Sequence, residues 1–293
     1  MRFRYENHED YGVMTGDGKV ISLPSLAKHL NKKLPKTLEK FIAASTIEKV
    51  EKMILEASRE VVEKAILSMD DVKLLAPLVN PPKIICLGLN YWDHAAECGA
   101  SIPEEPIIFF KPRTTIVGPN ENIVKPCFVR QLDYEAELAV VVGKKAKNVP
   151  VSEAENYIFG YTILNDVSAR DIQFKDKQWT RGKSFDTFAP LGPCILTRKQ
   201  MGDPSNLYIR TWVNGELRQN STTKNMVFNV YEVLHHLSRV MTLEPGDIIA
   251  TGTPAGVGFA MKPEPKFLRG GDVVKMEIEK IGVLENAVVE EPC

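Results

Sequence analysis

The most constraining feature of this chain is a pair of glutamates at the entrance to an apolar segment. Glu135 and Glu137 directly precede the run Leu138-Ala139-Val140-Val141-Val142, which is typical of a strand that enters a protein core. Because side chains alternate along a strand, the two glutamates share one face. Two like charges in a half-buried site stay ionised only beside a cation, since otherwise the pKa of one acid rises.

A third carboxylate is expected at the same point. The apolar segment 157–164 reads as a second strand, and Asp166 follows its end. Oxygen ligands without cysteine or histidine favour a hard divalent cation, Mg²⁺ first and Mn²⁺ or Ca²⁺ next. The alternative is that these acids lie on an exposed sheet face, where lysine or arginine pairs with them.

Composition excludes several classes of function. The chain has 293 residues, 44% hydrophobic and 26% charged, with a formal net charge of −1, so neither nucleic acid nor an anionic membrane is an expected partner. No apolar run approaches the roughly 18 residues that a membrane span needs. We therefore expect a soluble globular enzyme.

Cysteine spacing and the N-terminal residues bear on the compartment. The five cysteines are scattered without CxxC spacing, which argues against a disulfide framework or a zinc site and predicts a reducing compartment. The first ten residues lack an apolar signal region, and their acids are poorly suited to a transit peptide. The expected location is cytoplasmic, or the mitochondrial matrix if a longer precursor is trimmed.

The chain is predicted to divide near Asn80-Pro81-Pro82, because proline holds its predecessor extended and cannot continue a helix. Residues 1–80 read as a small α/β unit. It has short strands at 3–5, 11–14 and 19–23, and then one apolar stripe with helical spacing that runs from Val50 to Ile66. No catalytic constellation occurs there.

Residues 81–293 read as the catalytic unit. Short strands are predicted at 84–87, 107–110, 137–142, 157–164, 207–213, 247–250 and 273–278, and one helix at 229–241. Because few long helices alternate with the strands, the pattern favours an α+β, mostly β fold with a mixed or antiparallel β roll over a doubly wound sheet.

His94 and Glu97 form the first of three further candidate groups. They lie three residues apart in a short helical segment that ends at Gly99, so they share a face. A carboxylate beside an imidazole sets its tautomer, and the pair can move a proton. The segment fits a mobile lid, with Gly88 and Gly99 as hinges. The alternative is an exposed pair without a catalytic role.

The second group follows Asp166. In a helical turn, Arg170 and Gln173 lie on the side of that acid, where they can bind a carboxylate or carbonyl group. Lys183 stands in a loop rich in glycine, proline and aromatic residues and can neutralise a developing oxyanion. The alternative for Arg170 is an ordinary ion pair on a solvated helix.

The third group is the segment 251–258, which follows a predicted strand. Its glycines and threonines can present N–H and O–H donors to an anion. It is not a P-loop, because no Gly-Lys-Ser/Thr follows. A purely structural loop is the alternative.

Four motifs together resemble the fumarylacetoacetate hydrolase family, over about residues 82 to 285. They occur in the order Asp133-Tyr134-Glu135-Ala136-Glu137-Leu138, Asn165-Asp166-Val167-Ser168-Ala169-Arg170-Asp171, Gly182-Lys183-Ser184-Phe185-Asp186-Thr187-Phe188 and Thr251-Gly252-Thr253-Pro254-Ala255-Gly256-Val257-Gly258. The resemblance implies a mixed β-sandwich roll and a homodimer.

The same resemblance implies roles for individual residues. Glu135, Glu137 and Asp166 would hold the divalent metal, and His94 with Glu97 would form the dyad of the lid. The resemblance also implies that the substrate faces Lys183, Lys111, Arg170, Gln173 and Thr253.

The resemblance also implies a substrate, a small 2-oxo or 1,3-dicarbonyl acid whose enolate is stabilised by chelation to the cation. We expect a Mg²⁺-dependent hydrolase that cleaves a C–C bond in an acylpyruvate or fumarylpyruvate. Two alternatives stay open at this point: an oxaloacetate keto–enol tautomerase or decarboxylase, and an inactive protein that binds a metal and a keto acid.

Overall fold

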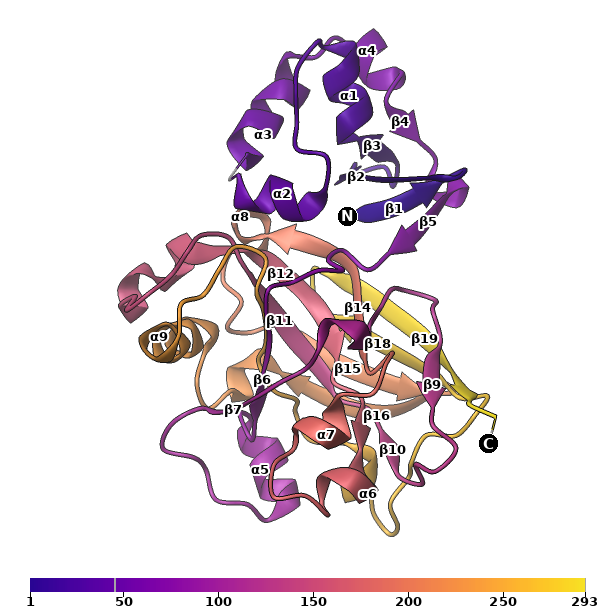
Figure 1. The fold of residues 1–293 in the computed structure, drawn as a ribbon, viewed down its shortest axis with the longest axis vertical. Coiled ribbons are helices and arrows are strands. Elements are labelled where there is room, and N and C mark those ends of the chain that lie inside the picture. The colour runs from indigo at the N-terminus through magenta and orange to yellow at the C-terminus, as the bar shows by residue number, and fades with distance from the viewer. Residues whose placement is uncertain (45, 293) are drawn as a thin grey trace.

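The computed structural model describes residues 1–44 and 46–292. Its N-terminal part forms a five-stranded sheet in the order β4-β3-β2-β1-β5, which lies with four short helices at one end of the molecule (Figure 1). The strands are β1 Arg2–Tyr5, β2 His8–Met14, β3 Val20–Ser22, β4 Ile66–Leu67 and β5 Val72–Leu75, and the helices are α1 Leu23–His29, α2 Leu38–Ala43, α3 Ile47–Glu56 and α4 Arg59–Glu63.

The apolar stripe predicted from Val50 to Ile66 is divided among three elements. Helix α3 ends at Glu56, and the next residue, Ala57, is extended. Ser58 then caps α4 by accepting a hydrogen bond from the Val61 amide, as N-cap serines do. Ile66 belongs to β4. The apolar residues therefore keep helical spacing although the helix itself is interrupted at Ala57 and begins again after Ser58.

The larger part of the chain contains a seven-stranded sheet and a second five-stranded sheet. The first has the order β7-β6-β17-β11-β12-β14-β8, and the second has the order β16-β15-β18-β19-β9. Most neighbours in both sheets are antiparallel, while β6–β17, β8–β14 and β9–β19 are parallel. The mixed, mostly β fold is thus confirmed.

The strands of the seven-stranded sheet are β6 Ile84–Gly88, β7 Ile107–Phe110, β8 Ile116–Val117, β11 Ala136–Val142, β12 Ile158–Asn165, β14 Ala189–Thr197 and β17 Ile248–Ala250. Those of the second sheet are β9 Ile123–Lys125, β15 Tyr208–Val213, β16 Glu216–Thr222, β18 Val273–Ile278 and β19 Gly282–Glu290. A small ladder pairs β10 Leu132–Asp133 with β13 Ser168–Ala169.

Three short helices gather at the end of the molecule that lies away from the N-terminal sheet (Figure 1). They are α5 Trp92–Cys98, α6 Arg170–Gln173 and α7 Thr180–Lys183, while α8 Arg198–Met201 and α9 Val230–Val240 lie elsewhere. All three contain predicted site residues: His94 and Glu97 lie on α5, Arg170 and Gln173 on α6, and Lys183 on α7.

Strand β11 is buried along its whole length, as its unbroken apolar run predicts. It pairs with β12 so that Ala136 lies opposite Asn165, and a large apolar cluster packs around this pair. The ends of two central strands therefore meet inside the protein, which fixes the backbone from which the acidic side chains project.

Three further expectations can be compared with the structure. No helix among the described residues is long and apolar enough to cross a membrane. Cys86, Cys98 and Cys194 are free thiols, but Cys127 is disulfide-bonded, so the argument against disulfides was wrong for that residue. The division into units 1–80 and 81–293 stays a prediction.

Candidate metal centre and active site

Three buried carboxylates converge at the ends of β11 and β12. The Asp166 amide donates to the Glu135 carbonyl oxygen at 2.9 Å, which places Asp166 across from the glutamate pair. Glu135 is 6% exposed, and Glu137 and Asp166 are fully buried. One ligand atom from each of the three lies within 4.8 Å of the others. The predicted metal ligands therefore do come together.

Buried cations neutralise part of this negative charge. Lys183 Nζ lies 2.7 Å from Glu135 Oε2 and 2.8 Å from Asp166 Oδ2. Lys111 Nζ lies 2.5 Å from Asp166 Oδ1, and Arg170 Nη2 lies 2.6 Å from Glu135 Oε1. Although burial opposes the ionisation of Glu135, the charges of Lys183 and Arg170 outweigh it and hold its pKa well below the usual range.

Glu137 is the carboxylate that lacks a cation. Its Oε2 accepts a hydrogen bond from the Gly252 amide at 2.9 Å, whereas its buried Oε1 has no hydrogen-bond partner among the described residues. Burial and then the charges of Asp166 and Glu135 raise its pKa well above the usual value. A buried acid without a partner is unfavourable, and a divalent cation among the three carboxylates would satisfy it. The donor set thus fits a hard divalent metal.

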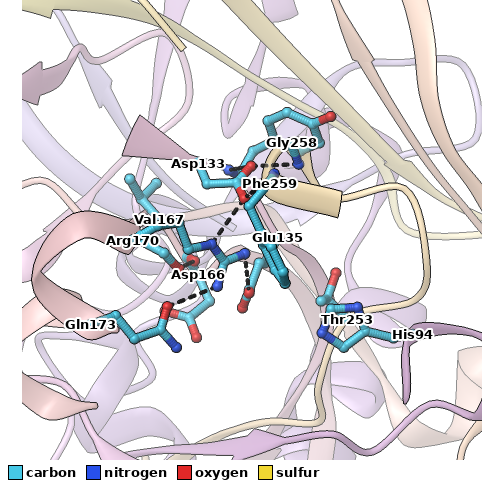
Figure 2. A network of polar contacts seen from close by, with 12 residues as sticks. His94, Asp133, Glu135, Asp166, Val167, Arg170, Gln173, Thr253, Gly258 and Phe259 are labelled. Atoms are coloured by element: carbon cyan, nitrogen blue, oxygen red, sulfur yellow. Dashed lines mark hydrogen bonds and ion pairs between the residues drawn. The ribbon is translucent and has the colours of Figure 1, made fainter. Parts of the chain in front are cut away.

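Asp133 organises the neighbouring backbone, a role that the sequence did not reveal. It accepts hydrogen bonds from the amides of Gly258 at 2.7 Å and Phe259 at 3.0 Å, and from Arg170 Nε at 2.9 Å. Arg170 also donates to Gln173 Oε1 at 2.9 Å. Figure 2 shows this network, in which the Arg170 guanidinium joins Asp133, Glu135 and Gln173.

The glycine-rich segment 251–258 does present N–H donors, but it offers them to the protein's own acids. Gly252 donates to Glu137 and Gly258 donates to Asp133, while Gly256 donates to Glu97 Oε2 at 2.9 Å. The Thr253 hydroxyl is also engaged, because it donates to the Ala136 carbonyl oxygen at 3.0 Å. This segment therefore positions three carboxylates, two from the region of β10 and β11 and one from α5.

His94 and Glu97 lie on α5, which ends where Gly99 adopts a left-handed conformation. His94 Nδ1 lies 2.7 Å from Glu97 Oε1. Burial disfavours the charged imidazole, but contacts with Cys98 and Glu97 outweigh it and raise the pKa of His94 to about 9. Nδ1 is held by Glu97, whereas Nε2 has only the weak contact with Cys98 Sγ at 3.8 Å, which a substrate can replace. The exposed-pair alternative is thus wrong for His94, which is 7% exposed.

A cavity of about 220 Å³ connects the two groups. Of the predicted site residues, its wall includes His94, Glu135, Arg170, Gln173, Lys183 and Thr253. Glu97, Glu137, Asp166 and Lys111 do not line it. Gln173 accepts from Arg170 through its carbonyl oxygen, so its NH₂ group remains to donate to a ligand.

Several cavity residues were not predicted. The wall also contains Cys98, Trp179 and Phe259. Trp179 packs so closely on Gly88 that an added Cβ would lie 2.0 Å from its ring, which explains the glycine by close approach. The Arg170 guanidinium lies 4.5 Å from the centroid of the Phe259 ring, a cation–π contact. Only proximity to the predicted motifs could have indicated these residues.

Comparison with known proteins identifies the family. The family model described as "Fumarylacetoacetate (FAA) hydrolase C-terminal" matches residues 83–289. The chain is 46% identical over 268 residues to the "Fumarylacetoacetate hydrolase domain-containing protein 2 homolog" of Dictyostelium discoideum, covering 88% of this chain and 87% of the relative.

Two further relatives bear on the site. The chain is 46% identical over 281 residues to the Bos taurus protein named "Oxaloacetate tautomerase FAHD2B, mitochondrial", covering 95% of this chain and 87% of that one. A maleylpyruvate hydrolase from Sphingobium, solved with manganese(II) and pyruvate, matches with a TM-score of 0.78 and 29% identity and covers 100% of both chains.

These relatives are named as enzymes, as we expected for this chain. The match covers more than half of the sequence and includes all of the carboxylates of the site. Taken with the fold and the buried acidic cluster, it shows that this chain belongs to the fumarylacetoacetate hydrolase family of enzymes.

Proposed function

We propose that this protein is a Mg²⁺-dependent keto–enol tautomerase of oxaloacetate or a closely similar 2-oxo dicarboxylic acid. The observation that carries the proposal is that His94 opens onto the same small cavity as Glu135, Arg170 and Lys183. A proton donor thus stands beside the groups that would hold a keto acid. The proposal places tautomerisation ahead of the C–C hydrolysis that we first expected.

The cavity suits a small acidic substrate. Its volume of about 220 Å³ is below the range of about 300–1,000 Å³ that is usual for larger ligands. Lys183 and the NH₂ group of Gln173 supply donors for the carboxylate and carbonyl oxygens. Arg170 acts chiefly by holding Glu135 and Gln173 in place, since its guanidinium is already bonded to three side chains.

Glu135, Glu137 and Asp166 would hold the Mg²⁺ ion. When bound, the ion would supply a positive charge against the oxygen on which negative charge develops during enolisation. Lys183, whose pKa is raised because nearby Asp166 and Glu135 charges outweigh the effect of burial, remains protonated and adds to that stabilisation.

His94 would perform the proton transfer. Because its pKa is about 9, the imidazole is protonated near neutral pH and can donate from Nε2 to the C3 carbon of the enol. A C3–H bond forms, the enol hydroxyl loses its proton to water, and the C=C π electrons move to C3 as the C2–O bond becomes a carbonyl. Water then reprotonates His94. Glu97 keeps Nδ1 engaged throughout.

Hydrolysis of an acylpyruvate is the second candidate. It is favoured by the similarity to the maleylpyruvate hydrolase, whose structure contains pyruvate. That reaction requires the dyad to accept a proton from water, which a protonated His94 does poorly. Decarboxylation of oxaloacetate shares the enolate and is tested by the same substrate.

One set of assays separates these activities. We expect faster loss of enol-oxaloacetate with Mg²⁺, followed by ultraviolet absorbance, and return to the uncatalysed rate with EDTA. Acetylpyruvate cleavage without enol loss would instead identify a hydrolase, and CO₂ release would identify a decarboxylase. Tight binding of 2-oxo acids with no turnover would indicate an inactive binding protein.

Assembly and location are proposed on the family resemblance. We expect a homodimer, which light scattering after size-exclusion chromatography will test. The cytoplasm is the location expected from the sequence, whereas the name of the Bos taurus relative supports mitochondria. Fractionation of cells that produce the untagged protein decides between them.

A further inference from the structure

Helix α5 carries a second group of metal-binding side chains besides the three carboxylates. His94, Glu97 and Cys98 each present one ligand atom, and these atoms lie within 4.8 Å of one another. Cys98 Sγ is 3.8 Å from both ring nitrogens of His94. Their spacing of three and four residues places all three on one face of the helix. Neither the dyad nor the carboxylate cluster explains why a thiol completes this group.

The distances suit tetrahedral coordination of a single ion. With bonds of about 2.0–2.1 Å to nitrogen or oxygen and about 2.3 Å to sulfur, neighbouring ligand atoms lie about 3.3–3.6 Å apart. Sγ and Nδ1 are 3.8 Å apart and Nδ1 and Oε1 are 2.7 Å apart. Moving Glu97 outward by roughly 0.6 Å would bring Nδ1 and Oε1 to that spacing. The contact between His94 Nδ1 and Glu97 Oε1 would then be replaced by an ion that both atoms coordinate.

The chemistry of the donors selects a different cation from that of the carboxylates. One nitrogen, one oxygen and one sulfur suit a borderline or soft ion such as Zn²⁺ or Cd²⁺, whereas Mg²⁺ requires oxygen. Cys98 is a half-buried free thiol in the cavity wall, so an ion can reach it from solvent. The negative charge of Glu135 acts on His94 and would also favour a cation there.

We propose that His94, Glu97 and Cys98 form an inhibitory site for a thiophilic divalent cation such as Zn²⁺. On binding, Cys98 and protonated His94 release their protons to water, and Glu97 turns from the imidazole to the ion. The imidazole is then neutral and keeps only its Nε2 proton, which is too weakly acidic to be donated to a substrate. That inhibition rests on the proposed function of the dyad, whereas binding of the ion does not.

The first experiment measures binding directly. Cd²⁺ is added to the protein in saturating Mg²⁺, and cadmium–thiolate absorbance in the ultraviolet is recorded. We expect a band that saturates at one ion per chain. Cys98→Ser should weaken Cd²⁺ binding by about tenfold or more, since it removes the softest donor. Cys194→Ser, at another half-buried free thiol, is the matched control and should leave the band unchanged.

The second experiment measures inhibition. Zn²⁺ should inhibit enol loss in the wild type at concentrations that leave Cys98→Ser active, with Mg²⁺ in excess. A wild type without a thiolate band, or a band that depends on Cys194, would overturn the site. Binding without inhibition would overturn its regulatory role. If the wild type has no turnover, the proposed function fails, while the absorbance band still decides whether the site exists.

Discussion

The carboxylate cluster and the histidine dyad face the same cavity but are built differently. Glu135 and Asp166 project from the ends of central strands and are cross-linked by buried ion pairs. His94 and Glu97 stand on a seven-residue helix whose first residue, Trp92, is 55% exposed. The two groups are therefore supported separately: the sheet holds the candidate cation site, and the short helix holds the proton donor, whose mobility as a lid stays a prediction.

The largest effect on the carboxylate cluster is expected from Glu135→Ala. It removes a predicted metal ligand and one of the two carboxylate partners of both Arg170 and Lys183. We expect Mg²⁺ binding by calorimetry to disappear and kcat/KM to fall about 10³-fold or more. Stability should also fall, but by less than the about 3–5 kcal/mol that follows when a buried charge loses its only partner, because Asp133 still pairs with Arg170 and Asp166 with Lys183. Glu135→Gln separates the lost charge from the lost volume, and Mg²⁺ affinity that survives in the alanine variant would refute the ligand assignment.

The matching test of the dyad on α5 is His94→Ala. Loss of the proton donor should lower kcat by about 10²–10⁴-fold, while calorimetry should show Mg²⁺ affinity close to that of the wild type. His236→Ala, on α9, is the control and should change neither quantity. If His94→Ala abolished metal binding as well, the two regions could not be independent.

Glu137→Gln tests whether the carboxylate cluster needs a bound cation. Its buried carboxylate has no cationic partner, so the amide should make the protein more thermally stable in EDTA than the wild type. The same variant should lose the stabilisation by Mg²⁺, which is about 2.7 kcal/mol at 100 times the dissociation constant. Thermal unfolding with and without Mg²⁺ measures both. A variant less stable than the wild type in EDTA would show that Glu137 does not need a cation.

The smallest expected effect concerns pH and the dyad. The folded protein raises the pKa of His94 from 6.5 to about 9, so protonation favours folding. The resulting stability is fully present below about pH 6.5 and is lost as the pH rises through about 9.

Urea unfolding of the wild type and of His94→Gln in EDTA provides the measurement. The difference between them should shrink by at most about 3 kcal/mol over that pH range, which is the free energy that corresponds to the rise in the pKa of His94, because glutamine does not titrate. A difference that is constant with pH would mean that the His94 imidazole is neutral throughout.

Sequence reasoning succeeded where a local period decides the structure. The runs in β11 and β12 are apolar enough to be read as buried strands, and alternation along β11 then places two glutamates together. Strands β16 and β19 were missed because polar residues such as Asn220 and Asn286 interrupt their pattern. Those strands exist because of their neighbours in the sheet, which no local window contains.

The site followed the same rule. The acids and the dyad could be predicted from short motifs, although their catalytic roles stay predictions. The function of Asp133 could not be predicted in this way, because its partner Gly258 lies 125 residues away in the sequence. Likewise, a role for Cys98 could not be predicted, because it depends on the position of its sulfur beside the His94 imidazole in the cavity wall. Contacts of this kind are set by tertiary packing.

The segment between Thr251 and Phe259 restricts which sequence changes the enzyme can accept. Backbone amides of Gly252, Gly256 and Gly258 hold Glu137, Glu97 and Asp133. A Cβ would lie 2.1 Å from a backbone oxygen at Gly256 and 2.4 Å from one at Gly258, so these glycines have no room for a side chain. Deleting or inserting one residue here would shift these amides and misalign the carboxylate cluster and the dyad at once. Evolution can therefore vary the half-buried Ala255 more freely than the length of this segment.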